Sequence, residues 1–343
     1  MTTSSTDPRA PLILVNPRAS RLADPGRRNG IVESVANAVE RRFGRAPRIE
    51  ADTLEATRIA LTEATETPIV VVIGGDGTVR EAAAALVDRD TPIAVIPSGT
   101  GNVLAGSLGI RGVGPGIEAI RAGLPRVLDL GHASWSPAAG DMTSDGSYSA
   151  ADGAGAAASD GIGAASDRGG REPAHDRIFI VACGMGLDAR IMAAAEHEWK
   201  RRIRFGAYIG AAFRELMRLE SARFHIVADG ETIDTEGYLV LVANAGELVP
   251  GRIGPRQPID PTDGRLDLIV LGGGNPLAGL RGAAELLVRS GDLDGRVIRR
   301  SVSEVTIEAD PPQPCETDGD PHPPGRLEAR TIPGGLTVLA PPR

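Results

Sequence analysis

The residues Gly74-Gly75-Asp76-Gly77-Thr78 directly follow Ile69–Ile73, an unbroken β-branched run. Glycines that lead from a strand into a helix leave backbone amides uncovered, and the helix N-terminus adds partial positive charge, so a polyphosphate can approach closely. Asp76 adds a carboxylate, which suits a Mg²⁺ ion that accompanies the phosphate. A plain strand-to-helix turn capped by Asp76 explains the same residues, so this motif alone leaves both interpretations open.

A second stretch repeats this arrangement one predicted strand later. Pro92–Ile96 is again continuously apolar, and Pro97-Ser98-Gly99-Thr100-Gly101-Asn102 follows it. In an open α/β sheet, ligands bind beyond the carboxyl ends of the strands, so the two loops are predicted to face one ligand. Thr100 and Asn102 offer a hydroxyl and an amide to phosphate or sugar oxygens, with helix capping as their alternative role.

Together the two motifs resemble the catalytic domain of the diacylglycerol kinase family, in particular its soluble bacterial lipid kinases, with sphingosine kinases as more distant relatives. Gly-Gly-Asp-Gly-Thr is shared with NAD kinases, so the second motif carries the specificity. The resemblance implies ATP and Mg²⁺ as cofactors and a lipid hydroxyl, by default that of diacylglycerol, as the phosphate acceptor. The predicted nucleotide site comprises Asn16, Pro17, Thr53, Gly74, Gly75, Asp76, Gly77, Thr78, Gly99, Thr100 and Asn102, with Asp76 also at the metal and helix capping as the alternative role of Thr53.

The sequence departs from the family pattern at two places in this half. Asn16-Pro17 matches the loop after the first strand, but the Ser-Gly pair that should follow is out of register, which leaves Ser20 as a displaced substitute. Arg80 stands where the family usually has Asn. Arg18, Arg21, Arg27 and Arg28 make the first loop basic, either to hold phosphates or as a solvated helix face.

Two acidic stretches lie in the second half. Asp260–Asp267 is dense in oxygen ligands that suit Mg²⁺ or Ca²⁺, although an Asp-Gly hairpin turn explains the pattern equally. The resemblance assigns a structural Mg²⁺ to Asp263 and to carbonyl groups near Asp260 and Arg265.

Glu316-Thr317-Asp318-Gly319-Asp320 resembles the family's Asp-Gly-Glu motif. Transfer of a phosphoryl group to an alcohol needs a carboxylate that orients the hydroxyl and accepts its proton. Asp318 is the predicted base, facing the hydroxyl of a lipid that enters between the domains. Asp320 stands where the family has the longer Glu, and an exposed turn is the alternative interpretation.

The elements that must position these residues alternate in the first third of the chain. Strands at Leu12–Val15, Arg48–Ala51, Ile69–Ile73 and Pro92–Ile96 are separated by predicted helices at Ile31–Phe43 and Leu54–Ala64. This alternation predicts an α/β domain with a parallel sheet. Later strands with few helices, such as Phe224–Asp234 and Leu266–Leu271, predict an antiparallel β-sandwich as the second domain.

The predicted domains are residues 1–124 for the nucleotide and 125–325 for the lipid, and residues 326–343 return toward the first domain. Residues 134–176 form a low-complexity insert, predicted to be disordered, between strands Val127–His132 and Arg177–Ala182. A helix is predicted between Trp199 and Leu219. Its basic start and apolar stripe suit either a membrane interface or packing on the sheet.

Composition narrows the class of protein. The chain has 343 residues, 41% of them hydrophobic and 24% charged, with a net charge of -8 that argues against nonspecific binding to nucleic acid. There is no signal-peptide pattern and no segment of membrane-spanning length, and Cys183 and Cys315 lie far apart. We therefore expect a cytoplasmic protein with free thiols that contacts the inner face of the membrane transiently as a peripheral protein. A homodimer is expected from the resemblance alone.

Two alternatives remain open at this point. An NAD kinase would phosphorylate soluble NAD, although the second glycine loop and the late acidic turn favour a lipid kinase. A nucleotide-binding regulator without turnover would explain the departures at Ser20, Arg80 and Asp320.

Overall fold

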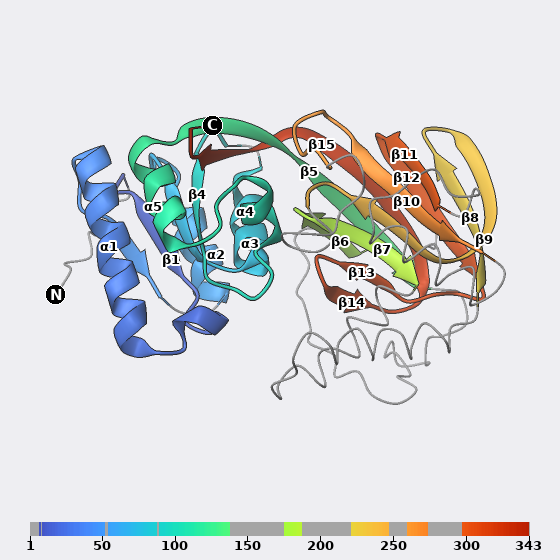
Figure 1. The fold of residues 1–343 in the computed structure, drawn as a ribbon, viewed down its shortest axis with the longest axis horizontal. Helices are drawn as coiled ribbons and strands as arrows, with labels where there is room; N and C mark the ends of the chain where they lie inside the picture. Colours follow the sequence, from blue (N-terminus) through green and yellow to red (C-terminus); the bar gives the residue numbers. More distant parts are fainter. Residues whose placement is uncertain are drawn as a thin grey trace. The chain divides into compact units, whose positions relative to one another are not determined.

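The computed structural model describes residue 7 and residues 9–51, 54–87, 89–137, 175–186, 221–246, 259–273 and 297–342. The chain divides into two compact units (Figure 1). Unit 1 consists of Met1–Leu130, Asn244–Gly264 and Ile332–Arg343, and unit 2 of Gly131–Ala243 and Arg265–Thr331. The chain thus leaves unit 1 after Leu130 rather than near Leu124, because the main-chain amide of Asp129 donates a hydrogen bond of 2.6 Å to Pro261, itself part of unit 1.

Unit 1 contains a parallel sheet. Its strands β2 (Arg48–Glu50), β1 (Leu12–Val15), β3 (Val70–Gly74) and β4 (Ile93–Pro97) lie in that order. Every residue of β1, β3 and β4 is buried, which confirms the prediction drawn from their continuous apolar runs. The end of β15 (Gly325–Ala340) joins this sheet through parallel pairing of Val338 with Ile93.

Helices cover both faces of this sheet (Figure 1). Helix α1 (Pro25–Phe43) packs beside α5 (Val113–Ala122), and α2 (Leu54–Glu63) packs beside α3 (Asp76–Leu86). Val35 and Val39 of α1 and Ile120 of α5 share a buried core with the strands. Two short helices complete the unit, the 3-10 turn η1 (Ser20–Leu22) and α4 (Val103–Ser107).

Helix α1 begins earlier than its apolar periodicity predicts, at Pro25 instead of Ile31. The Asp24 carboxylate accepts a hydrogen bond of 2.7 Å from the amide of Arg27, and proline suits the first helical position because it has no amide hydrogen to leave unpaired. The cap, and not the apolar stripe, therefore fixes the start of the helix.

Unit 2 is an antiparallel β structure. Its strands follow the order β14-β13-β7-β9-β8-β12-β15, and β10 pairs with β9 and β11. This architecture confirms the predicted antiparallel β-rich second domain. The strands are β6 (His175–Phe179), β7 (Ala182–Gly186), β8 (Ala222–Ala228), β9 (Glu231–Ala243), β10 (Leu266–Gly272), β11 (Val297–Val302), β12 (Glu304–Asp310), β13 (Cys315–Thr317) and β14 (Asp320–His322).

The predicted insert at 134–176 starts too early and ends too late. Strand β5 (Leu124–Pro137) pairs with β6 through Ser134 with Asp176 and Trp135 with His175, so both edges of the insert are regular strand. Burial of Trp135 among the apolar side chains of unit 2 explains why the strand continues past His132. The remainder of the insert lies outside the described residues, as do the predicted helix at Trp199–Leu219 and Thr53.

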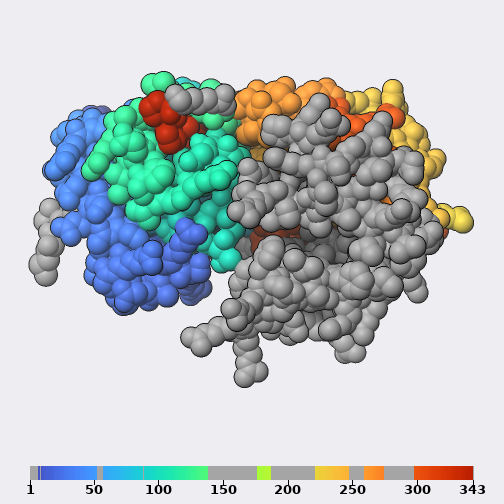
Figure 2. Space-filling model, in the orientation of Figure 1, coloured from blue at the N-terminus to red at the C-terminus, as the bar shows by residue number. Residues whose placement is uncertain are grey.

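The C-terminal residues lie on unit 1. Figure 2 shows them in red against the green surface of that unit, in agreement with the pairing of Val338 and Ile93. Within the described part of the chain, no helix has the length and apolar character needed to cross a membrane.

Candidate functional site

The first glycine loop joins β3 to α3, with Gly75 as the N-cap. Its three glycines have different surroundings. A Cβ atom on Gly74 would lie 2.7 Å from Oγ1 of Thr78, and one on Gly75 would lie 3.1 Å from Cα of Gly99, whereas one on Gly77 would meet nothing within 4 Å. Protein packing therefore leaves little room for a side chain at 74 and 75, while the open space at Gly77 is available to a ligand.

The Asp76 carboxylate ties the first loop to the second. Oδ2 accepts a hydrogen bond of 3.0 Å from the amide of Val103, and Oδ1 accepts one of 3.3 Å from the amide of Leu104. Burial raises the pKa of Asp76, and these amide hydrogen bonds oppose the rise without cancelling it. Asp76 thus sits at the N-terminus of α4, where it holds the two loops together.

The second loop, Pro97–Asn102, is braced from within by Asn102. Its Oδ1 accepts a hydrogen bond of 2.9 Å from the amide of Gly99, and its Nδ2 donates one of 2.7 Å to the carbonyl oxygen of Gly99. Asn102 adopts the left-handed conformation, with φ of 54°. Its side chain therefore shapes the loop, and of the predicted ligands in this loop Thr100 is the exposed one.

The loop after β1 completes the arrangement. Nδ2 of Asn16 donates a hydrogen bond of 3.0 Å to Oγ1 of Thr78, and its Oδ1 accepts one of 3.0 Å from the amide of Arg18, the residue after Pro17. The hydroxyl groups of Ser20 and Thr100 lie 3.4 Å apart. Three loops thus meet at the carboxyl ends of β1, β3 and β4. The predicted nucleotide residues lie in these loops or at the adjoining ends of β3 and α3, except Thr53, which is not described.

Arg80, the departure from the family pattern, is buried in α3 with 6% of its surface exposed. Its guanidinium lies 3.5 Å from Glu81, whose other oxygen is 2.9 Å from Arg58. The Arg80 side chain thus belongs to a cluster of charged side chains with Glu81 and Arg58.

The acidic turn of unit 2 joins β13 to β14. Oδ1 of Asp318 accepts hydrogen bonds from the amides of Val181 at 2.8 Å and Ala182 at 3.1 Å, and Oδ2 accepts one of 2.9 Å from Ile180. Ile180 and Val181 lie between β6 and β7, and Ala182 begins β7, so the single strand predicted at Arg177–Ala182 is divided in two where these amides turn to Asp318. The carboxylate is therefore firmly held by three backbone amides.

Neighbouring side chains fix the same turn. Asp320 accepts a hydrogen bond of 2.6 Å from Arg177, and the buried Glu316 accepts one of 2.6 Å from the amide of Gly319. The ring of His322 stacks on Trp135 with centroids 3.7 Å apart. Of the two predicted catalytic residues, Asp318 is therefore fixed by backbone and Asp320 by an ion pair at the surface.

The loop predicted to hold a structural metal contains a local turn. Oδ1 of Asp260 accepts hydrogen bonds from both the amide and the hydroxyl of Thr262, and Asp263 is exposed. The Arg265 side chain is bonded to Ser301, Ser303 and Asp229 of unit 2. Within the residues that the structure describes, no group of three or more His, Cys, Asp or Glu side chains could hold a metal ion.

A Mg²⁺ ion that arrives with a nucleotide needs only one or two protein carboxylates. Asp76 fits this requirement because it is a carboxylate that directly precedes Gly77, where a ligand has open space. The residues present therefore suit a metal carried by the phosphates, and Asp76 is the carboxylate that would hold it.

Sequence analysis missed Asp129, which organises unit 1. Its buried carboxylate accepts hydrogen bonds from the amides of Gly264 at 2.6 Å and Gly334 at 2.8 Å, and its carbonyl oxygen accepts one of 2.9 Å from Asn244. The sequence feature that could have indicated this role is a single acidic residue within the apolar segment Val127–Leu130.

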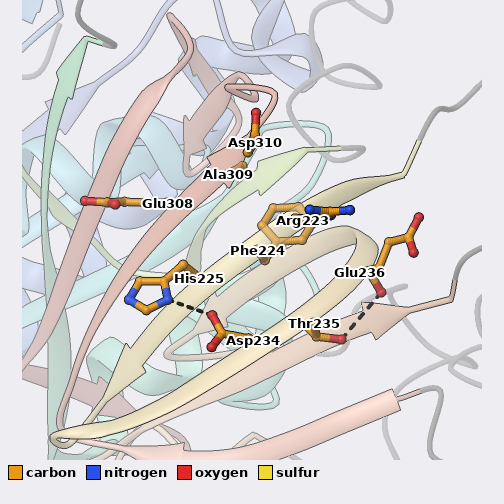
Figure 3. Close-up of a pocket in the computed structure, with 9 residues that line it drawn as sticks. All are labelled: Arg223, Phe224, His225, Asp234, Thr235, Glu236, Glu308, Ala309 and Asp310. Carbon is orange, nitrogen blue, oxygen red and sulfur yellow. Dashed lines mark hydrogen bonds and ion pairs between the residues drawn. The ribbon is translucent and has the colours of Figure 1, made fainter.

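A separate hollow of about 530 Å³ lies on β8, β9 and β12 of unit 2 (Figure 3). Two basic residues of β8 each stand between two acidic ones: Arg223 between Glu236 and Asp310, and His225 between Asp234 and Glu308. Nδ1 of His225 lies 2.7 Å from Oδ1 of Asp234. Because acidic and basic groups alternate across the strands, we assign no ligand to this hollow.

Both units of the chain match models of known protein families. Residues 11–133 match the family model of the diacylglycerol kinase catalytic domain, and residues 181–340 match that of the YegS C-terminal NAD kinase beta sandwich-like domain. The chain belongs to the diacylglycerol kinase catalytic-domain family. Membership in the diacylglycerol kinase family agrees with the resemblance drawn from the two glycine motifs.

The relatives found by these comparisons share little sequence identity with the chain. An uncharacterized protein from Synechocystis sp. is 25% identical over 79% of this chain, which spans only about half, 54%, of that relative. Two solved structures from Bacillus anthracis str. Sterne named for diacylglycerol kinase share 19% and 18% identity, with TM-scores of 0.68 and 0.64. Each match covers 97% of this chain, and they cover 98% and 97% of the respective structures, so the fold is shared throughout.

Proposed function

We propose that the protein is an ATP- and Mg²⁺-dependent kinase that phosphorylates the hydroxyl group of a lipid, with a diacylglycerol-like lipid as acceptor. The observation that carries this proposal is the meeting of three loops at the carboxyl edge of the parallel sheet, with open space at Gly77. The family supports a kinase acting on lipids, and this geometry supports a phosphate site within it.

The nucleotide phosphates approach the first turn of α3 at Gly77, where a side chain would occupy the space they need. The exposed Thr100 hydroxyl and the basic loop after β1 offer further donors and positive charge. A Mg²⁺ ion bound with the phosphates would offset charge that develops on the transferring group. Asp76 is the protein carboxylate that would hold it.

Asp318 is the proposed base for the acceptor hydroxyl. Its fixed position suits that task, because a base that is already oriented does not lose rotamer entropy when the substrate binds. We further propose that the protein works in the cytoplasm, touches the membrane surface to reach its lipid, and forms a homodimer. Vesicle co-sedimentation tests the membrane contact, and light scattering tests the homodimer.

The decisive experiment supplies γ-phosphate-labelled ATP and mixed micelles that contain diacylglycerol, sphingosine or phosphatidylglycerol, with NAD as a soluble acceptor. We expect label in a lipid and ADP release that depends on both lipid and Mg²⁺. The matched control is Asp234→Asn, an exposed acidic residue in the hollow of unit 2, which should retain full turnover. Label in NAD alone would refute the lipid kinase proposal.

One observation favours a second candidate, a nucleotide-binding regulator without turnover. The Asp318 carboxylate already accepts hydrogen bonds from three backbone amides. An acidic turn with a purely structural role would have the same hydrogen bonds. This candidate predicts saturable ATP binding by calorimetry with no ADP release for any acceptor tested.

A further inference from the structure

The chain passes between the two units four times. Unit 1 consists of three segments and unit 2 of two, so the crossings follow Leu130, Ala243, Gly264 and Thr331. Rotation of one unit against the other must be absorbed by a few residues at such crossings, so hydrogen bonds beside them limit the rotation. Each unit holds the residues next to the crossings in its own way.

On the side of unit 1, Asp129 holds a residue near every crossing. It directly precedes Leu130, and its carbonyl oxygen accepts a hydrogen bond of 2.9 Å from the side chain of Asn244. Its carboxylate accepts bonds from the amides of Gly264 at 2.6 Å and Gly334 at 2.8 Å. Asn244 and Gly264 begin and end the second segment of unit 1, and Gly334 lies near the start of the third. Because Asp129 is buried, loss of these bonds leaves polar groups unpaired away from water.

On the side of unit 2, Arg265 makes the corresponding contacts. Its guanidinium donates hydrogen bonds of 2.9 Å to the hydroxyls of Ser301 and Ser303 and one of 2.7 Å to Oδ2 of Asp229. Oδ1 of Asp229 accepts a bond of 2.8 Å from the amide of Ser303. The carbonyl oxygen of Ser303 accepts one of 2.9 Å from the amide of Thr331. The third and fourth crossings are thus tied to one turn of unit 2, between β11 and β12.

We propose that Asp129 and Arg265 are positioning residues that anchor the crossings and restrict rotation of one unit against the other. The inference rests on the proposed function, because the proposed base, Asp318, and the proposed phosphate site at Gly77 belong to different units. A misplacement of about 1 Å between reacting groups can cost about a hundredfold in rate. Freedom at the crossings therefore lowers turnover, whereas ATP binding is unchanged because the nucleotide loops lie within unit 1.

The first arm of the test measures the separation of the units without any reaction. Nitroxide labels are attached to the whole protein at Glu118→Cys in α5 and Thr232→Cys in β9, both of which replace exposed side chains. The buried Cys183 and Cys315 should remain unlabelled in the folded protein. Pulsed electron paramagnetic resonance then gives the distribution of distances between the two labels.

Asp129→Ala and Arg265→Ala should each broaden this distribution, because each removes a group that several hydrogen bonds share. Arg265→Lys should restore part of the parent width, since lysine can still pair with Asp229 but lacks the planar fork. The matched control is Arg300→Ala in β11, which removes an exposed ion pair with Glu231 and should keep the parent width.

A purely structural role of Asp129 predicts a different result. Stability would fall, but the molecules that remain folded would keep the parent distances. If Asp129→Ala does not fold, Asp129→Asn, which keeps one acceptor oxygen, takes its place. A folded variant with the parent width removes its residue from the anchor, and this result in both Asp129 and Arg265 variants overturns the inference.

The second arm measures turnover of the lipid in the same variants. The kcat should fall about ten- to hundredfold while the KM for ATP stays at the parent value. A parent-like kcat in a variant with a broadened distribution would refute the positioning role. Broadening in variants of a protein that has no turnover with any lipid supports the anchor and refutes the proposed function alone.

Discussion

The backbones of Gly75 and Gly99 face each other so closely that a Cβ atom added to Gly99 would lie 2.6 Å from Cα of Gly75. Side-chain carbons do not approach backbone atoms this closely in proteins. The contact makes the two glycine motifs halves of one structure, whereas Gly77 lies in open space.

The first prediction compares alanine at these two kinds of glycine. Gly99→Ala should destabilise the protein by about 1–3 kcal/mol, because neither backbone can move away without opening the loops. Gly77→Ala makes the same chemical change where no atom lies within 4 Å, in the first turn of α3. It should leave stability unchanged or raise it by up to about 1 kcal/mol, yet weaken ATP binding. Thermal unfolding and ATP titration measure both effects, and normal ATP affinity in Gly77→Ala would exclude phosphate from that space.

The second prediction concerns pH. Burial raises the pKa of Asp76 above its ordinary value of 3.8, despite the opposing amide hydrogen bonds. A carboxyl whose pKa is higher in the folded than in the unfolded protein lowers the free energy of unfolding when it is ionised. This loss of stability is complete above the folded-state pKa and disappears as the pH falls below it. Bound Mg²⁺ needs the ionised form.

The part of ATP affinity that depends on Mg²⁺ should therefore be lost on acidification at a higher pH than an unperturbed aspartate would give. Titrations with and without Mg²⁺ at several pH values measure this difference. Asp76→Asn supplies the control because protonation of ATP itself affects both proteins alike. An identical pH profile in the two proteins would remove Asp76 from the metal site.

The third prediction separates structure from catalysis in the acidic turn. Asp318→Asn leaves one acceptor oxygen for three amides, which should cost about 1–3 kcal/mol of stability. If Asp318 is the base, turnover also falls about 10²- to 10⁴-fold at a temperature where the variant remains folded, while the KM for ATP is unchanged. Asp320→Asn weakens a surface ion pair with Arg177, and such pairs are worth less than about 1 kcal/mol. Full lipid turnover by folded Asp318→Asn would show that the base is another group.

The fourth prediction tests the role of Asp129. Asp129→Ala removes the acceptor for the amides of Gly264 and Gly334 and should lower the free energy of unfolding by about 2–4 kcal/mol. Asp129→Asn keeps one acceptor and should cost less. Urea unfolding measures both, with the exposed Asp234→Ala as control. Equal stability of Asp129→Ala and the parent protein would mean that water replaces the carboxylate without cost.

The fifth prediction uses the two thiols. Cys183 and Cys315 are both fully buried, and burial raises the pKa of Cys183 well above its usual value and that of Cys315 to about 12. A thiol reagent should modify neither cysteine in the folded protein and both after denaturation, because the reactive species is the thiolate. Fast modification of the native protein would contradict the packing around β7 and β13.

The strands of unit 1 were predictable because their burial on both faces leaves continuous apolar runs such as Ile69–Ile73. The strands β13 and β14 were missed because each has three residues and no apolar alternation. Strand β13 forms by pairing with β7, more than a hundred positions earlier in the chain, and β14 forms by pairing with β13.

The candidate site, like the fold, was predictable only where the signal is local in the sequence. The sequence placed the glycine loops correctly because strand, glycine and helix follow one another locally. It could not show that Asn102 bonds to its own loop, nor that three amides of a distant segment hold Asp318. Such roles depend on where the chain returns in space, and residue type alone does not encode that.

Unit 1 is discontinuous, since it takes in residues 244–264 and 332–343 as well as the first 130. The neighbour of β4 at Val338 and the amide of Gly334 that bonds to Asp129 are synthesised after nearly everything else. During synthesis, unit 1 therefore begins to form first but is completed only after residues 332–343 have been made. Any fragment ending before residue 332 leaves the edge of β4 open to pairing with another chain, a route to aggregation.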